Sequence, residues 1–158
     1  MNIHQTSPTK NKNNHTAAAL TRGLTRYFRG LDQVCISEFA LKNRRRADIV
    51  ALDQTGVFTI VEIKSSRNDF MTDHKWQDYL EFCDRFYFAV DQSFPSKLIP
   101  PTCGLIIADE YYAEIIRDCQ VKKMHSARRR AMTLRFARTA AQRLINLTDQ
   151  GPRELLSD

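Results

Sequence analysis

Two carboxylates and a lysine occur at a spacing that suits phosphate chemistry. Asp48 lies at the start of the apolar run 47–52, and Glu62 and Lys64 lie at the end of the next apolar run, 57–64. Residues 53–56 (DQTG) are a turn signature, so the two runs are predicted to form an antiparallel hairpin. In such a hairpin the residue numbers of two paired positions add to a nearly constant value, and a short loop makes this value about 110. Asp48 then lies opposite Glu62, and Lys64 lies on the same face. A slip of one residue would break this arrangement.

A divalent cation would account for the two carboxylates. In an otherwise apolar sheet they repel each other and resist loss of water. Their oxygen atoms suit Mg²⁺ (or Mn²⁺), and the backbone carbonyl of Ile63 could add a ligand. Lys64 would then lie beside a metal-bound water, where it could orient the water or stabilise charge on a phosphate. The alternative is a structural ion pair of Glu62 with Lys64 or with an arginine of residues 44–46.

Other polar side chains are predicted near this site. A turn at 42–45 would fold a strand over 34–41 onto the 47–52 strand, which brings Glu38 near Asp48 as a further metal ligand. The alternative for Glu38 is an exposed glutamate paired with Arg44 or Arg45. A helix over 68–83, capped by Asn68 or Asp69, should follow the Glu-x-Lys strand. Four residues of this helix are further candidates for the active site: Asp69, Asp73, Lys75 and Tyr79. The alternative for each is a structural role in capping, packing or ion pairing.

The distribution of charge predicts a polyanionic partner. Residues 1–31 contain five Lys/Arg and no acid, residues 32–118 contain ten Lys/Arg and fifteen Asp/Glu, and residues 119–148 contain eight Lys/Arg and no acid. Basic flanks attract polyanions, and nucleic acid is the commonest of these. An acidic centre between basic flanks suits a metal-dependent nuclease, and the alternative is a solvated surface with no partner. The candidate DNA-binding residues are Arg44, Arg45, Arg46, Arg128, Arg129, Arg130, Arg135 and Arg138.

The length of 158 residues predicts one domain. We expect a flexible N-terminal tail over 1–14, a core over 15–118 in which a helix begins near Thr16, and a basic C-terminal helix and tail over 119–158 packed on the core. The last helix, 126–147, has an apolar side made of Leu134, Ala137, Ala141, Leu144 and Ile145. Strands are expected over 34–41, 47–52, 57–64, 85–90 and 103–108, and residues 111–116 form either a short sixth strand or a helical turn. This order predicts an α/β fold, a mixed β-sheet core flanked by helices with an added C-terminal basic helix.

The composition excludes several classes of protein. No apolar run approaches the ~18 residues of a membrane span, and the polar N-terminus has no signal-peptide core. The four cysteines lie far apart without a Cys-x-x-Cys pair, so neither a zinc site nor a disulfide framework is indicated. We therefore expect a cytoplasmic protein with reduced thiols and no membrane partner.

Residues 16–108 resemble the PD-(D/E)xK nuclease superfamily. Asp48 matches the motif aspartate, and Glu62 and Lys64 match the Glu-x-Lys pair. The proline that often precedes the aspartate is Ala47 here. The resemblance implies a restriction-endonuclease-like fold and a site that uses a divalent metal.

A narrower resemblance covers nearly the whole ordered chain. The run RRADIVALDQTG, followed by VEIKSSRNDF, DHKWQDY, CDRFYFAV and GLIIAD, is similar to the MmcB family of bacterial DNA repair proteins. This resemblance implies a restriction-endonuclease-like fold and a role in DNA damage repair, so we expect a nucleoid-associated protein whose partner is DNA. A metal-dependent DNA endonuclease activity is inferred from the nuclease-like fold. The alternative is a catalytically inactive accessory factor that keeps the nuclease fold and binds DNA. The sequence leaves open a homodimer and partnership with other repair proteins.

Overall fold

The computed structural model describes the backbone of residues 9–149 and the side chains from Thr16 onward. It divides into two compact units, one up to Met124 and one from His125. The elements of the first unit include two 3₁₀ helices, η1 and η2, and the second unit holds the helix α3. In chain order the elements are α1 (Thr9–Gly30), β1 (Val34–Ala40), β2 (Arg46–Leu52), β3 (Phe58–Lys64), α2 (Arg67–Thr72), η1 (Trp76–Phe82), β4 (Arg85–Val90), η2 (Ser96–Leu98), β5 (Gly104–Ala108), β6 (Ala113–Arg117) and α3 (Ser126–Thr148).

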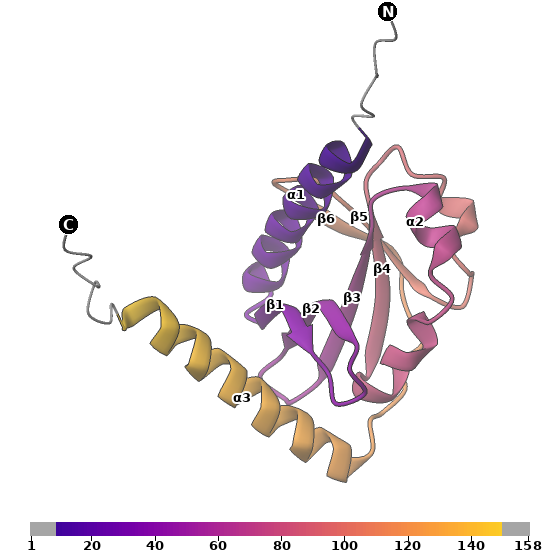
Figure 1. Cartoon of the computed structure of the whole chain (residues 1–158). Helices are drawn as coiled ribbons and strands as arrows, with labels where there is room; N and C mark the ends of the chain where they lie inside the picture. The colour runs from indigo at the N-terminus through magenta and orange to yellow at the C-terminus, as the bar shows by residue number, and fades with distance from the viewer. Residues whose placement is uncertain (1–8, 150–158) are drawn as a thin grey trace, which may run out of the picture. The chain divides into compact units, whose positions relative to one another are not determined.

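The first unit is built on one six-stranded mixed sheet in the order β1-β2-β3-β4-β5-β6 (Figure 1). The pairs β1–β2, β2–β3 and β5–β6 are antiparallel, whereas β3–β4 and β4–β5 are parallel. Parallel neighbours need a crossover connection, and α2 with η1 supplies the one between β3 and β4. The carboxyl ends of β3, β4 and β5 therefore meet at one edge of the sheet. The predicted α/β fold with a mixed sheet flanked by helices is confirmed.

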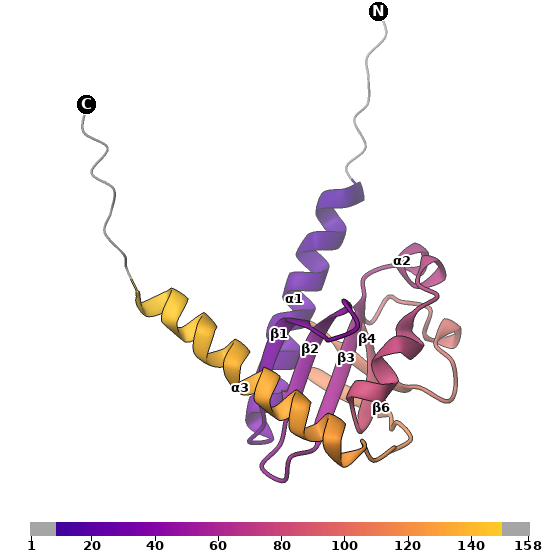
Figure 2. The same ribbon diagram turned by 60° about the horizontal axis from the view of Figure 1, so that its bottom comes forward.

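Within the first unit, α1 covers one face of the sheet (Figure 2) and the 3₁₀ helix η1 packs on the other. On one face, Leu20, Leu24 and Phe28 of α1 lie at helical spacing and are buried in a cluster with alternate residues of β2 to β5. On the other face, the Trp76 ring of η1 stacks on Phe86 of β4, with ring centroids 5.6 Å apart. Every residue of β3 is buried, which is the pattern of a strand covered on both sides.

The β2–β3 hairpin has the register that the sequence predicts. Val50 pairs with Ile60 and Leu52 pairs with Phe58. In the turn, the side chain of Asp53 accepts a hydrogen bond from the backbone N–H of Thr55 at 2.8 Å and one from that of Val57 at 2.9 Å. Gly56 adopts a φ of +86°, a conformation that favours glycine. The turn fixes the register, and the register fixes which side chains share a face.

The start of α1 differs from the prediction. The helix begins at Thr9, not near Thr16, so residues 9–14 of the predicted tail belong to α1. No glycine or proline interrupts residues 9–22, and extending an existing helix costs little compared with nucleating one. The rest of the two predicted tails, residues 1–8 and 150–158, lies outside the described residues.

The predicted single helix over 68–83 is also wrong, because the chain leaves the helix at Asp73. Ser66 is the N-cap of α2, in place of Asn68 or Asp69, and its Oγ accepts the backbone N–H of Asp69 at 3.1 Å. Asp73 has extended backbone angles, and its carboxylate accepts the backbone N–H of Lys75 at 3.0 Å. Such a local hydrogen bond competes with the helix. The four candidate residues of this segment therefore do not lie on one helix.

Helix α3 forms where the sequence predicts it, but its predicted buried side is wrong. The buried residues of α3 are Met132 and Phe136. Leu134, Leu144 and Ile145 of the predicted side are 63%, 61% and 53% exposed. Apolar residues lie on two opposite sides of this helix, so periodicity alone does not identify the buried one. Packing of the helix on the core stays a prediction.

None of the helices within residues 9–149 is long and apolar enough to cross a membrane.

Candidate active site

A cleft of about 490 Å³ opens at the carboxyl end of β3. One wall comes from α1 and another from the first turn of α2, and the floor comes from β2 and β3. The two carboxylates and the lysine of the predicted site all line it. The lining residues are Ala17, Thr21, Glu38, Asp48, Glu62, Ile63, Lys64, Ser65, Ser66, Asn68, Asp69 and Thr72.

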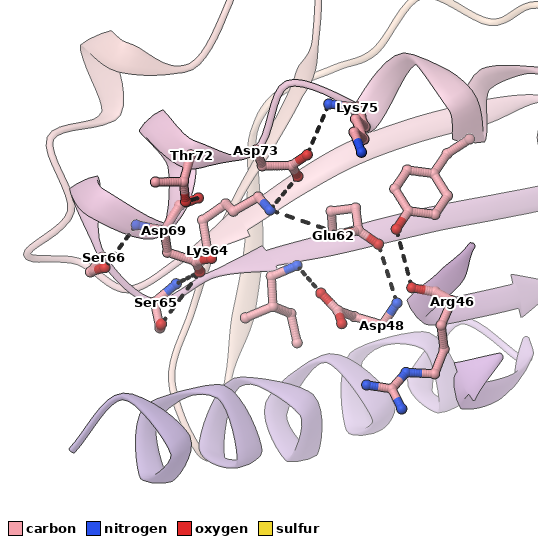
Figure 3. A network of polar contacts seen from close by, with 12 residues as sticks. Arg46, Asp48, Glu62, Lys64, Ser65, Ser66, Asp69, Thr72, Asp73 and Lys75 are labelled. Atoms are coloured by element: carbon pink, nitrogen blue, oxygen red, sulfur yellow. Dashed lines mark hydrogen bonds and ion pairs between the residues drawn. The ribbon is translucent and has the colours of Figure 1, made fainter. Parts of the chain in front are cut away.

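Asp48 and Glu62 lie side by side across the β2–β3 ladder (Figure 3). The backbone N–H of Asp48 donates to Oε1 of Glu62 at 3.3 Å, and the backbone N–H of Ile63 donates to Oδ2 of Asp48 at 2.7 Å. These two hydrogen bonds hold the carboxylates against the backbone of the opposite strand. The hairpin therefore brings together Asp48 and Glu62, as the predicted register requires.

Burial and mutual repulsion make this pair a poor carrier of two negative charges. Burial raises the pKa of Asp48 to about 6. Burial, together with the charge of Asp48, raises the pKa of Glu62 to about 8. A cation bound between the two groups would favour their ionised forms and remove the repulsion. The carboxylates thus fit the donor set of a hard divalent ion.

Lys64 is a fixed positive charge beside the carboxylates. Its Nζ lies 2.5 Å from Oδ2 of Asp73 and 4.0 Å from Oε2 of Glu62. Burial lowers the pKa of Lys64, but the hydrogen bond and charge of Asp73 outweigh burial, and the pKa is raised. The ammonium therefore stays protonated and acts through its charge.

Of the other helix candidates, Tyr79 is buried next to the acid pair and Lys75 is not in the cleft. The Tyr79 hydroxyl donates to the carbonyl oxygen of Arg46 at 3.1 Å. Burial and the charges of Glu62 and Asp48 raise the pKa of Tyr79, so the phenol stays a donor. The Lys75 side chain is exposed, and the backbone N–H of Lys75 donates to the Asp73 carboxylate. Whether either residue acts in catalysis stays a prediction.

Glu38 lies across the β1–β2 ladder from Asp48. The neighbouring pairs are Ser37 with Ile49 and Phe39 with Ala47, so the same register places Glu38 opposite Asp48. Glu38 has a φ of +51°, a conformation that costs a non-glycine residue about 1 kcal/mol. Its carboxylate lines the cleft and lies 2.6 Å from Nε of Arg46. The ion pair is with Arg46, not with Arg44 or Arg45, and metal binding by Glu38 stays a prediction.

The predicted arginines are placed in two separate regions. In the β1–β2 turn, Arg45 pairs with Asp78 at 2.8 Å and Arg46 pairs with Glu38, which partly neutralises this cluster. Arg44 is exposed in the same turn. The remaining candidates, Arg128, Arg129, Arg130, Arg135 and Arg138, all lie on α3. DNA contact by either group stays a prediction.

Sequence reasoning named Asp69 as a candidate but missed Ser65 and Ser66 beside it and the α1 wall of the cleft. Oδ2 of Asp69 accepts the backbone N–H of Ser65 at 3.1 Å, while Ser66 caps the helix. The signal for this cap is present in the sequence, since Ser66 precedes Asp69 by three positions, a spacing typical of reciprocal capping. No local pattern indicates the α1 wall, because Ala17 and Thr21 reach the cleft through tertiary packing.

A complete metal cage is not present in the part of the chain whose side chains are described. Within residues 16–149, no three His, Cys, Asp or Glu side chains lie close enough together to hold a metal ion. Asp48 and Glu62 would therefore supply two ligands to a metal ion, and backbone, water or substrate oxygens would have to complete its coordination. Mg²⁺ is often bound in this way, by one or two carboxylates plus waters and phosphate oxygens.

Fold and site together define a mixed α/β protein with a carboxylate–lysine cleft at the end of its third strand. The sequence profile of the MmcB-like DNA repair proteins matches residues 4–151, and the chain belongs to this family. A solved structure, the SPO1766 protein of unknown function from Silicibacter pomeroyi, is 41% identical, with a TM-score of 0.83. The match covers 90% of this chain and 97% of that one. No curated protein sequence matches the chain significantly.

Proposed function

We propose that this protein is a metal-dependent DNA endonuclease of the PD-(D/E)xK type that acts in DNA repair. The observation that carries the proposal is the buried pair of Asp48 and Glu62 with Lys64 beside it in an open cleft. Membership of a DNA repair family supports DNA as the substrate. The mixed sheet flanked by helices is compatible with a restriction-endonuclease-like fold.

In this mechanism each residue of the cleft has a separate task. Asp48, Glu62 and the backbone carbonyl of Ile63 would hold Mg²⁺ (or Mn²⁺), which when bound supplies charge neutralisation and a more acidic water. Lys64 places a fixed positive charge where a phosphodiester would enter, so it stabilises negative charge that develops on the phosphate. Asp73 holds the Lys64 ammonium in place, and α1 and α2 form the walls of the cleft.

A second candidate is a DNA-binding accessory factor with the same fold and no turnover. The observation in its favour is that Asp48 and Glu62 lack a third acidic or imidazole ligand within residues 16–149. In that case the two carboxylates would be structural, and the arginines would carry the function.

The two candidates differ in their response to metal. We would measure cleavage of labelled single-stranded, double-stranded and branched DNA with Mg²⁺ or Mn²⁺, and metal binding by calorimetry. The nuclease predicts that Asp48→Asn and Glu62→Gln each lower cleavage by at least about 100-fold and abolish metal binding, while DNA binding survives. Asp78→Asn, which changes an exposed carboxylate outside the cleft, is the matched control.

The alternative outcomes are equally distinct. DNA binding without metal binding or cleavage in the wild type would support the accessory factor. Full cleavage by both variants would exclude Asp48 and Glu62 as the metal ligands. Affinity for DNA that does not fall with salt would contradict both candidates, because each phosphate contact releases counterions.

A further inference from the structure

A second hollow, of about 1040 Å³, lies between α1, the end of β4 and the β5–β6 hairpin. We call it the acidic groove. Its lining includes four acidic residues and no lysine or arginine. Apolar side chains line it as well, among them Leu20 and Ile116. The four acidic residues are Asp91, Asp109, Glu110 and Glu114.

The acids of this groove are at least partly exposed. Asp109 accepts the backbone N–H groups of Tyr111 and Tyr112 at 2.7 and 2.8 Å, and these bonds hold its pKa below the ordinary value. Glu110 is half exposed and pairs with Arg22 at 2.9 Å. Glu114 is exposed on β6. A nucleic acid backbone would be repelled here, whereas a segment with both basic and apolar side chains would be complementary.

Two apolar side chains of the groove lining are exposed. Tyr112 is 77% exposed and Ile116 is 50% exposed. Both belong to the β5–β6 hairpin, and β6 is an edge strand of the sheet. Exposed apolar groups rimmed by charges are typical of a protein-binding surface.

Helix α3, considered by itself, carries the complementary chemistry. Its residues Ser126–Thr148 include six arginines and no acid. Leu134 and Leu144 are 63% and 61% exposed. Around the helix, Leu134 lies about 160° from both buried residues, Met132 and Phe136, and Leu144 lies about 120° from Met132 and about 80° from Phe136. An exposed apolar side on a basic helix needs an acidic, partly apolar surface to cover it.

We propose that α3 of a second copy of this chain docks in the acidic groove. Charge complementarity selects this occupant, because α3 contains six arginines and no acid, while the groove lining holds four acids, of which Glu110 is already paired with Arg22 of α1. The exposed leucines would cover the apolar lining, and the arginines would face the carboxylates. Reciprocal exchange of the two helices closes a two-fold dimer. Direct pairing of two α3 helices would instead bring arginine against arginine.

The inference is independent of nuclease activity, and its test is the oligomeric state of the full chain. Sedimentation equilibrium up to roughly 100 µM protein would detect even a weak homodimer. The groove variant is Glu114→Arg with Ile116→Arg, and the helix variant is Leu134→Asp with Leu144→Asp. We expect each to weaken dimerisation by at least about tenfold. Asn146→Asp, at an exposed position about 120° around α3 from Leu134 and about 160° from Leu144, is the control and should leave the dimer intact.

Mixing the variants tests the reciprocal arrangement. The groove variant keeps an intact helix and the helix variant keeps an intact groove, so the mixture should form a heterodimer that neither variant forms alone. Raising salt from about 0.05 to about 0.5 M should weaken the wild-type dimer, because screening reduces the charge attraction. Circular dichroism and thermal melting show that each variant is folded.

Three results would overturn the inference. A wild-type chain that stays monomeric up to the highest concentration would show that the groove does not receive a second copy. A groove variant that dimerises like the wild type would place the interface elsewhere, and pairing of two α3 helices would be the explanation if the helix variant is monomeric. A mixture of two folded variants that does not associate would exclude reciprocal exchange.

Discussion

The Lys64 ammonium is bound more closely by Asp73 than by Glu62, the acid two positions away on the same strand. The distances from Nζ are 2.5 Å to Oδ2 of Asp73 and 4.0 Å to Oε2 of Glu62. Asp73 is also the C-cap of α2, so one carboxylate both ends a helix and positions the lysine. Glu62 is therefore not held in a close ion pair with Lys64.

Asp73→Asn tests whether this contact positions the lysine. The amide keeps the shape but loses the charge that holds the ammonium, so we expect kcat for DNA cleavage to fall about tenfold with KM little changed. Asp73→Glu should restore part of the loss. Asp78→Asn removes an exposed carboxylate nearby and should leave kcat unchanged. Equal rates for Asp73→Asn and the wild type would show that Lys64 does not depend on Asp73.

The acid pair predicts an unusual pH dependence for the metal-free protein. In the unfolded chain both acids titrate near pH 4, whereas in the folded chain the pKa values of Asp48 and Glu62 are raised to about 6 and about 8. Between these limits the folded state holds protons that the unfolded state has released. The free energy of unfolding therefore falls as pH rises from about 4 to about 8.

Urea unfolding in the presence of a chelator measures this effect. We expect the wild type to lose more than about 1 kcal/mol between about pH 5 and about pH 8. Glu62→Gln should flatten the profile, and Glu114→Gln, an exposed glutamate, should not. A wild-type profile that rises with pH over this range would mean that the acid pair is not desolvated in solution.

The hairpin that builds the site was predictable because its information is local. The apolar residues of the two runs and the turn at Asp53 and Gly56 determine the register of the hairpin, and the register places Asp48 opposite Glu62. The positions of the strands along the chain were predicted from similar apolar runs. The break in the predicted helix was not accessible, because Asp73 leaves the helix while contacting Lys64 on another element.

Other parts of the site and fold depend on tertiary packing that no sequence window contains. The left-handed backbone of Glu38 occurs inside a strand with no glycine to mark it. The α1 wall of the cleft comes from residues whose spacing resembles that of any amphipathic helix. On α3, the apolar residues on opposite sides gave two candidate faces, and the longer series, which includes Leu134 and Leu144, is the exposed one.

A buried carboxylate outside the cleft tests the stability of the sheet unit. Asp84 is 4% exposed, and its side chain accepts the backbone N–H groups of Phe58 at 2.9 Å and Met124 at 2.8 Å. Asp84→Ala leaves these buried donors without that acceptor, so we expect a loss of about 3 kcal/mol in the free energy of unfolding. Asp78→Ala, at an exposed ion pair, should cost less than about 1 kcal/mol. Urea unfolding of both variants is the measurement, and equal losses would contradict this role of Asp84.

Two glycines of α1 offer a matched test of how closely this helix approaches the sheet unit. A Cβ atom at Gly23 would lie 2.0 Å from the carbonyl oxygen of Asp109, which is backbone and cannot move aside easily. Gly23→Ala should therefore force α1 away from the β5–β6 loop and cost about 2 kcal/mol of stability.

Gly30, at the end of the same helix, has no atom within 4 Å of the position of a Cβ. Gly30→Ala should stabilise the protein by about 0.5 kcal/mol, because alanine loses less backbone entropy on folding. Urea unfolding of the two variants should thus give changes of opposite sign. A neutral Gly23→Ala would show that α1 lies farther from the β5–β6 loop in solution, and the wall that α1 gives to the active-site cleft would then be less closely held.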